Sequence, residues 1–469
     1  MGCRIADRPI EGVRFSARMP LTHSGLLKRS FRKDYPVAVR GEGVFIYDSE
    51  GHRYLDLCGS AAVTFIGHGD RRVAAAVTEQ LRQIEFVHSS QFTTAAAQQF
   101  ADEVLTFAGP AFADGAVFFT AGGSEAVETA LKLARQYQVE IGEAQRVNFL
   151  SREQSYHGAT VGAMSVSGNR KRKQIYEPQL HSYDQVHTPY CYRCRYGCRD
   201  CAAQYAIEVE DVLARKGHET AAFIFEPVSG ATIGAAVPPD GYLQRVARAC
   251  TEKDVLVIAD EVMTGFGRTG RNFAVEHWNV APGIIVAAKG IASGYAPLGA
   301  VIANKNVVEA IAGGSGALVH GFTYNAHPMS VAAGRAVLNI IRDRELVCRA
   351  DSRTPGTAGK TMKTQLQRLV ECSAVGDVRG VGLLWGVEFV ASTETKAPFS
   401  PEAQFASRVA AAAAKRGVMT YPMQGCIDGE RGDHLLLAPP AVITQEEVSW
   451  AVEQLAAAIN ETHHEVSRS

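Results

Sequence analysis

The sequence lacks the features that would place it in a specialised class. No apolar run approaches the about 20 residues needed to cross a bilayer, and no apolar block typical of a secretory signal stands near the start. Neither charge dominates, since 48 Lys and Arg against 49 Asp and Glu leave a formal net charge of −1. Such a balance excludes a strong global attraction to nucleic acid or to an anionic membrane. We therefore expect neither partner.

Paired cysteines are also scarce over most of the chain. Outside one cluster near residue 195 the cysteines are scattered, at Cys3, Cys58, Cys250, Cys348, Cys372 and Cys426. Scattered thiols are typical of a reducing compartment, so we expect a cytoplasmic protein. No internal repeat or coiled-coil pattern is present either.

The 469 residues, 46% of them hydrophobic, are enough for a large core. From about residue 90, short apolar runs alternate with helical periods, and Thr93 and Thr94 can cap a helix that ends near residue 107. This alternation predicts an α/β fold with a mostly parallel sheet covered by helices. The expected strands are at residues 117–119, 147–150, 222–225, 255–259, 284–286 and 300–303.

A different pattern surrounds this region. Residues 37–57 alternate like strands joined by tight turns, and the chain after Pro328 mixes helices with short strands. We predict a large domain over 75–330 and a smaller α+β domain built from both ends of the chain, 1–74 and 331–469. Residues 151–205 give no regular pattern and are expected to be irregular.

Two features at expected strand ends favour binding of a phosphate and of a ring nitrogen. Gly122, Gly123 and Ser124 lie between a strand and a helix, where small residues and free backbone amides suit a phosphate. Asp260 directly follows an apolar strand, so its carboxylate is expected in the crevice at the sheet edge, where it can hold a ring nitrogen protonated. A plain glycine turn and a helix-capping aspartate are the simpler alternatives.

A lysine and an aromatic pair complete the set. Lys289 closes a hydrophobic strand, where burial lowers an amine pKa and favours Schiff-base chemistry; a lysine that extends to the surface is the alternative. Tyr156 and His157 follow another strand, and an aromatic ring there can stack on a flat cofactor or simply pack. Together the four features predict a site for pyridoxal 5′-phosphate (PLP), with Lys289 on its aldehyde and Asp260 on its ring nitrogen.

The chain resembles the class III PLP-dependent aminotransferases of fold type I from about residue 24 to 460. The most specific match is the word at residues 260–270, with Lys289 placed 29 positions beyond Asp260. The other matching words are Gly67-His68-Gly69, Gly123-Ser124-Glu125-Ala126, Tyr156-His157-Gly158, Glu226-Pro227-Val228, Ala288-Lys289-Gly290 and Gly321-Phe322-Thr323-Tyr324-Asn325-Ala326-His327-Pro328.

The resemblance implies a role for each matching residue. Lys289 would bind the cofactor and later move the substrate proton, and Asp260 would pair with the pyridine nitrogen. Tyr156, within the Tyr156-His157 word, and Val262 would cover the two faces of the ring. The remaining implied roles are phosphate binding by Gly123 and Ser124, a gate on the substrate side at Glu226, and contact with the phosphate of a neighbouring subunit by Thr323, which implies a homodimer with shared active sites.

Two substrate positions depart from the family pattern. Many amine-accepting relatives have Trp five residues before the Gly-His-Gly word, where this chain has Ala62, so the resemblance implies a roomier pocket. Relatives often carry a mobile arginine near the C-terminus, and Arg431 is the nearest candidate, or a structural loop arginine. The implied reaction passes nitrogen from an amino donor to an oxo acid or aldehyde in two ping-pong half-reactions. Decarboxylases, racemases and aminomutases of the same fold are the alternative.

The cysteine cluster stands outside this chemistry. Cys191, Cys194, Cys198 and Cys201 form two Cys-x-x-Cys pairs, the usual halves of a structural zinc site, but only three residues separate the pairs instead of about 15 to 20. A surface insertion with reduced thiols or one disulfide is the simpler interpretation, and we assign no metal to the catalytic chemistry.

Overall fold

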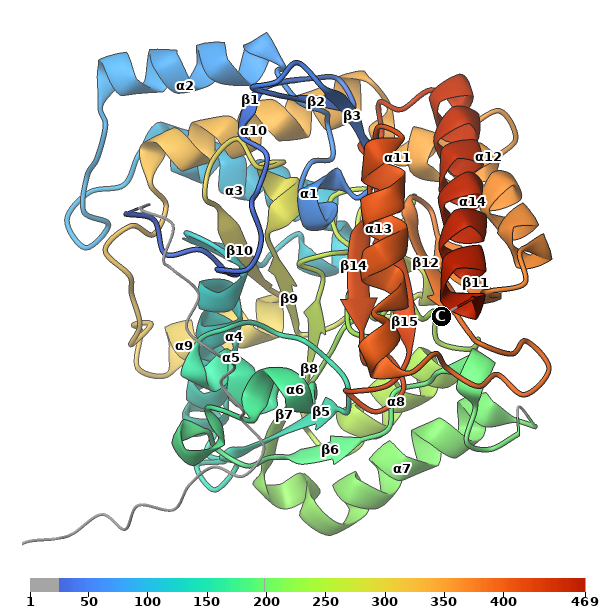
Figure 1. The fold of residues 1–469 in the computed structure, drawn as a ribbon. Helices are drawn as coiled ribbons and strands as arrows, with labels where there is room; N and C mark the ends of the chain where they lie inside the picture. The colour runs from blue at the N-terminus through green and yellow to red at the C-terminus, as the bar shows by residue number, and fades with distance from the viewer. Residues whose placement is uncertain (1–24, 198, 469) are drawn as a thin grey trace, which may run out of the picture.

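A computed structural model describes residues 25–197 and 199–468 of the chain. Its centre is a seven-stranded sheet of order β4-β10-β9-β8-β7-β5-β6 (Figure 1). The pairs from β9 to β6 are parallel, and β10 is antiparallel to both of its neighbours. The strands are β4 (Ala116–Thr120), β5 (Asn148–Arg152), β6 (Asp184–Val186), β7 (Thr220–Phe225), β8 (Leu256–Asp260), β9 (Ile284–Ala287) and β10 (Gly299–Ala303). The predicted α/β class is therefore confirmed.

Helices cover both faces of this sheet because its strands are apolar on both sides. All six residues of β7 and all four of β9 are buried. Thr94 caps α3 by accepting a hydrogen bond from the Ala97 N–H, as its position in the sequence predicts. The helices are α2 (Arg71–Gln83), α3 (Ala95–Ala108), α4 (Gly123–Glu140), α5 (Val161–Val166), α6 (Arg170–Lys173), α7 (Cys201–Lys216), α8 (Tyr242–Thr251), α9 (Lys305–Gly313) and α10 (Pro328–Asp343).

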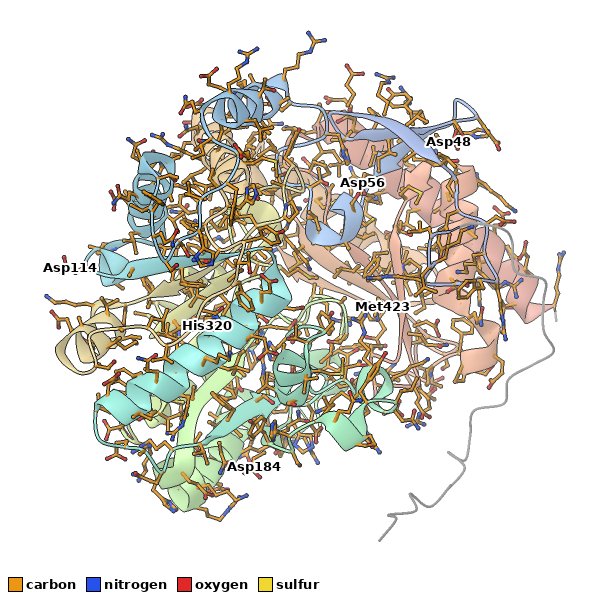
Figure 2. All side chains as sticks on the ribbon, turned by 90° about the vertical axis from the view of Figure 1, so that its left-hand side faces the viewer. Asp48, Asp56, Asp114, Asp184, His320 and Met423 are labelled. Atoms are coloured by element: carbon orange, nitrogen blue, oxygen red, sulfur yellow. The ribbon has the colours of Figure 1, made fainter. Side chains whose placement is uncertain are left out.

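The two ends of the described chain share a second sheet. Strand β3 pairs in parallel with β13, so residues near 55 lie beside residues near 418. Figure 2 shows the blue N-terminal segment that carries Asp48 and Asp56 next to the red C-terminal elements. The elements of this part are β1 (Ala38–Glu42), β2 (Phe45–Asp48), β3 (Arg53–Asp56), α1 (Gly59–Ala62), α11 (Leu346–Ala350), α12 (Ala358–Gln367), β11 (Val375–Val381), β12 (Leu384–Phe389), α13 (Phe405–Lys415), β13 (Val418–Met419), β14 (Tyr421–Gln424), β15 (Asp433–Leu437) and α14 (Gln445–Ser467).

Residues 151–205 are more regular than the sequence predicts. They contain α5, α6 and the edge strand β6, and α7 begins at Cys201. Strand β6 has three residues and α6 has four, which is too short for a period to be visible in the sequence. The prediction of an irregular region was therefore wrong; β6 forms because it pairs with β5, which lies far from it in the sequence.

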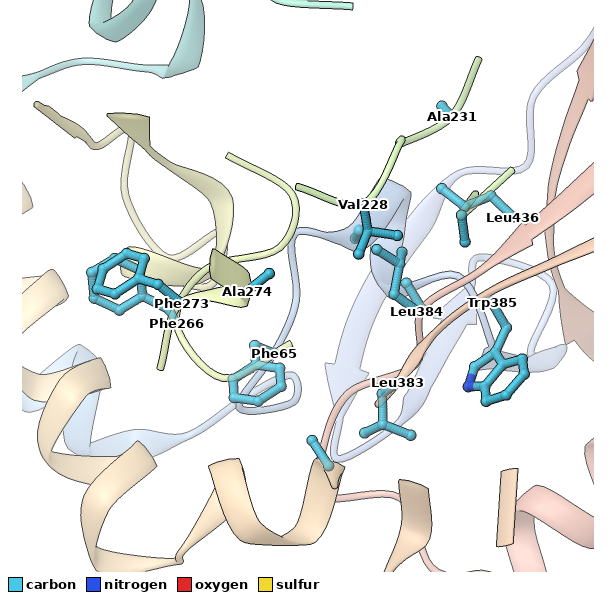
Figure 3. Close-up of a cluster of buried hydrophobic side chains, with 14 of the residues drawn as sticks. Phe65, Val228, Ala231, Phe266, Phe273, Ala274, Leu383, Leu384, Trp385 and Leu436 are labelled. Carbon is cyan, nitrogen blue, oxygen red and sulfur yellow. The ribbon is translucent and has the colours of Figure 1, made fainter. Parts of the chain in front are cut away.

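One buried cluster joins the large sheet to the C-terminal part. Figure 3 shows Val228 and Ala231, which follow β7, in the same cluster as Leu384 and Leu436 of β12 and β15. The loop after β7 is therefore fixed by apolar contact from two sides. Within residues 25–197 and 199–468, no helix is long and apolar enough to cross a membrane.

Candidate active site

A cavity of about 320 Å³ lies at the carboxyl ends of the parallel strands. In open α/β sheets, ligands bind in the crevice at this edge. The side chains that follow β7, β8 and β9 enter the cavity, and the N-terminus of α4 forms another wall. Its walls include Val63, Gly122, Gly123, Ser124, Tyr156, His157, Glu226, Val228, Asp260, Val262 and Lys289.

Lys289 extends into this cavity from the residue pair that follows β9. Its backbone is left-handed, with φ +48°, at the start of a short 3₁₀ turn. Burial lowers the pKa of the Lys289 amine to about 8, and the negative charges of Asp260 and Glu226 partly oppose that decrease. A substantial fraction of this amine is therefore neutral and nucleophilic near pH 8.

Asp260 ends β8 and its carboxylate is held on two sides. Its Oδ1 accepts the Val262 N–H at 3.1 Å, and its Oδ2 lies 2.7 Å from Nδ1 of His157. Both side chains are buried, with His157 at 0% and Asp260 at 4% exposure. His157 Nε2 is buried without a hydrogen-bond partner among the described residues. The pair fixes one carboxylate at the cavity wall in a defined orientation.

The start of α4 has the geometry of a phosphate cradle. Gly122, the N-cap, makes no side-chain cap bond, so the first amides of an 18-residue helix have no side-chain acceptor. A Cβ atom on Gly123 would lie 3.1 Å from Val262 Cγ1 and would fill the space between them. Ser124 Oγ accepts the Ala159 N–H at 3.0 Å, which fixes the hydroxyl beside these amides.

Glu226 and Tyr156 form the opposite wall. The Glu226 carboxylate accepts the N–H groups of Tyr156 at 3.3 Å and of Gly230 at 3.0 Å. Burial raises the pKa of the Glu226 carboxyl. Tyr156 and Val262 both line the cavity.

Ala62 does not line the cavity, whereas the resemblance implied that it borders the substrate pocket and makes it roomier. Residues 59–62 form one left-handed turn, in which Ser60, Ala61 and Ala62 all have φ between +48° and +68°. Asp56 holds this turn by accepting the backbone N–H and the hydroxyl of Ser60, both at 2.9 Å. The turn buries Ala62 in the core at 2% exposure and brings Val63 to the cavity.

Arg431 and Thr323 also lie outside the cavity. Arg431 Nε donates to Asp428 Oδ2 at 2.6 Å on an exposed turn, so the structure does not bring this arginine to the site. Thr323 is exposed on a turn before α10 and does not line the cavity of its own chain.

The cysteine cluster lies in the segment between β6 and α7. Cys191 is exposed, Cys194 and Cys201 are half-buried, and Cys198 lies outside the described residues. No group of three potential metal ligands gathers among the residues that the structure describes. The zinc hypothesis therefore stays open at this position.

Comparison with known proteins decides the family. The model of the family described as aminotransferase class-III matches residues 29–459. The chain belongs to the class III aminotransferases. It is 39% identical over 442 residues to the uncharacterized aminotransferase YodT of Bacillus subtilis, covering 94% of this chain and 97% of that one. It is 33% identical to the adenosylmethionine-8-amino-7-oxononanoate aminotransferase of Geobacter sulfurreducens, covering 97% and 98%.

Solved structures agree with the sequence comparison. An amine transaminase from an uncultivated Pseudomonas species, determined in a PLP-bound form, superposes with a TM-score of 0.86 at 36% identity, covering 94% of this chain and 98% of that one. Class III aminotransferases use PLP, and this aminotransferase has a cavity that fits it. An amine, a fixed carboxylate, an uncapped helix start and the side chains of Tyr156 and Val262 all border one space.

Two features of the site were not found by sequence reasoning. The hydrogen bond between His157 and Asp260 joins residues 103 positions apart. Arg172, in the short helix α6, places its guanidinium carbon 4.5 Å from the centre of the Tyr156 ring. The basic run at residues 170–173 was its only sequence signal, and such a run is usually a solvated surface.

Proposed function

We propose that the walls of this cavity carry both half-reactions of a PLP-dependent aminotransferase, first from an amino donor and then to an oxo acid or aldehyde. The observation that carries the proposal is the convergence of the Lys289 amine and the Asp260 carboxylate on one cavity from adjacent strands. When bound, PLP supplies a ring that withdraws electrons from the substrate Cα.

Lys289 would hold the aldehyde carbon of the cofactor through Nζ, for which a neutral amine is required. The same Nζ would also move the proton between the substrate Cα and the cofactor C4′. The lowered pKa of Lys289 supports this role, because a base near neutrality both accepts and returns a proton efficiently.

Asp260 keeps the cofactor's ring nitrogen protonated. Its carboxylate is oriented by His157 and by the Val262 N–H, so it need not reorganise when charge develops. His157 is a positioning residue in this scheme, because it acts through Asp260.

The residues on the other walls would bind and orient the cofactor and the substrate. Gly123 and Ser124 at the start of α4 hold the phosphate, and Tyr156 and Val262 enclose the ring. Glu226 sits on the substrate side as a gate. Its buried carboxylate accepts two backbone N–H groups, so its position depends on the loop that follows β7.

We also propose a homodimer with shared active sites. The turn at residues 321–326 supports it, since Thr323 and Tyr324 are exposed there, with the apolar Val319 close by in sequence. Thr323 would contact the phosphate in the neighbouring subunit. The buried thiols of Cys58, Cys250 and Cys426 form no disulfide, which supports the proposed cytoplasmic location.

The decisive test supplies an amino donor and an oxo acid to the purified holoenzyme and measures the aminated product. Nitrogen transfer that depends on both substrates is expected in the wild type and absent in Lys289→Ala. Carbon dioxide release or racemisation without nitrogen transfer would instead identify a decarboxylase, racemase or aminomutase. A Lys289→Ala protein with normal turnover would overturn the assignment of the lysine.

A further inference from the structure

No arginine of the described parts of the chain, 25–197 and 199–468, lines the cavity. The charged groups that line it are Glu226, Asp260, Lys289 and, when protonated, His157. With Lys289 committed to the cofactor, the acidic side chains of Glu226 and Asp260 would remain on the described walls, and no second permanent cation lies among them. A substrate carboxylate that enters this space needs a cation within reach, because burying it unpaired is costly.

Most nearby arginines are already engaged. Arg152 is fully buried and donates to the Glu226 carbonyl. Arg268 is fully buried and donates to the carbonyls of Pro439, Leu383 and Thr64. Neither can turn toward a ligand without leaving a buried carbonyl unpaired.

Arg172 differs from these residues. Its side chain is half-buried, and no carboxylate or carbonyl among the described residues accepts a hydrogen bond from its guanidinium. Its guanidinium stacks on the ring of Tyr156, which is itself a wall of the cavity. Asn169 caps helix α6 by accepting the Arg172 N–H at 3.2 Å, so the backbone that carries this arginine is fixed.

We propose that Arg172 is the cation that receives the carboxylate of amino-acid donors and oxo-acid acceptors in this enzyme. The geometry supports it, because the guanidinium carbon lies 4.5 Å from the centre of a ring that borders the site. Among the residues that the structure describes, no carboxylate pairs with the donors of this long side chain. Stacking on Tyr156 keeps the guanidinium group close to the cavity. Amines and aldehydes have no carboxylate and would not need this cation.

Electrostatics agree with this position. The charge of Arg172 contributes to the lowered pKa of Lys289, so its field reaches the reacting amine. The side chain is also separate from the surface cations of its own helix, since Arg170 and Lys171 are exposed and Lys173 donates to the carbonyls of Ser165 and Ser167.

The test uses two small probes that both condense with the aldehyde of bound PLP and release the Lys289 amine. Aminooxyacetate carries a carboxylate and O-methylhydroxylamine does not. The inference rests on the proposed function only for the presence of PLP in the cavity, and this capture proceeds whatever reaction the enzyme catalyses. Failure of nitrogen transfer therefore cannot be mistaken for failure of the role of Arg172.

The variant is Arg172→Met, because methionine keeps a contact with the Tyr156 ring and removes the charge. We expect its second-order rate of capture by aminooxyacetate to fall about 10-fold or more, and that for O-methylhydroxylamine to change less than about 2-fold. Arg172→Lys should retain part of the faster capture by aminooxyacetate relative to O-methylhydroxylamine. In steady state, Arg172→Met should raise KM for oxo acids and leave aldehydes unaffected.

Arg170→Gln is the matched control, since it removes the same charge from the same helix without touching Tyr156. Equal slowing of both probes in Arg172→Met would show that Arg172 only supports the tyrosine, and would overturn the proposal. So would an unchanged preference, or an equal loss in Arg170→Gln. The absorbance of bound PLP and the melting temperature establish that each variant is folded and loaded.

Discussion

His157 Nδ1 lies 2.7 Å from Asp260 Oδ2, and both side chains are almost completely buried. The pair connects the loop after β5 with the end of β8, so the orientation of one carboxylate depends on two strands. A buried carboxylate that has a partner on one oxygen and a backbone donor on the other is a rigid group. Such a group suits a site where charge develops on a cofactor ring.

The first prediction concerns this pair. Asp260→Asn should keep bound PLP but lower turnover about 100-fold or more, because an amide does not hold the ring nitrogen protonated. His157→Phe should have a smaller effect on turnover, since the Asp260 carboxyl group is still present but loses one of the two partners that orient it. Absorbance of the bound cofactor and steady-state kcat measure the two effects. Equal losses in both variants would contradict the division of roles.

The second prediction concerns pH. Because burial lowers the pKa of Lys289 to about 8, the apoenzyme should capture added PLP faster as pH rises through about 8 and then level off. An ordinary lysine would keep gaining rate toward pH 10.5. Between about pH 8 and 10.5 the unfolded chain keeps the Lys289 proton that the folded chain has released. The contribution of Lys289 to the free energy of unfolding therefore rises with pH over this range. Stopped-flow absorbance measures the capture rate. A rate that keeps increasing above pH 9 would contradict it.

The third prediction concerns Arg431. Since its guanidinium pairs with Asp428 on an exposed turn, Arg431→Ala should change stability by less than about 0.5 kcal/mol. It should also leave the ratio of kcat/KM for oxo acids and aldehydes unchanged. Parallel assays with one oxo acid and the matching aldehyde decide this. A selective loss toward the oxo acid would mean that Arg431 moves into the site on binding.

The fourth prediction separates Ala62 from Val63. Val63→Ala should widen the cavity and improve kcat/KM for bulkier amines, because Val63 lines it. Ala62→Trp should instead destabilise the fold by about 3 kcal/mol or more, because position 62 is buried and left-handed. Thermal unfolding and a series of amines of increasing size test both. A stable Ala62→Trp enzyme with a narrowed pocket would restore the sequence interpretation.

The fifth prediction concerns the segment that carries the cysteine cluster. Glu388, fully buried in β12, accepts hydrogen bonds from Tyr190, from Arg193 at 2.7 Å and from Arg379 at 2.8 Å. Burial alone opposes ionisation of Glu388, but Arg379, Tyr190 and Arg193 lower its pKa overall.

Glu388→Gln should therefore cost about 3 kcal/mol or more in the free energy of unfolding, because two arginines lose a buried anion. A carboxyl with a lowered pKa stabilises the fold above its unfolded pKa and loses that effect as pH falls below about 4.5. The difference between wild type and variant should thus shrink in acid. Denaturant unfolding at pH 7 and at pH 4 measures it, and a constant difference would contradict the argument.

The sequence by itself determined the α/β class and the chemistry of the site. Lys289 and Asp260 each close an apolar strand, and strand ends of a parallel sheet meet at one edge whatever the details of packing. Local rules of this kind act over a few residues, so the glycine turn before α4 and the cap at Thr94 were also predictable. The division at residues 74 and 330 stays a prediction.

Tertiary structure alone decided which of several similar residues face the site. Asp56 holds the left-handed turn at residues 59–62 from outside the turn. As a result Ala62 is buried in the core and Val63 lines the cavity. A local ion pair keeps Arg431 on the surface, and a ring contact holds Arg172 against Tyr156, which lines the cavity. These outcomes depend on contacts between elements, and a side chain's direction is set by its neighbours in space rather than along the chain.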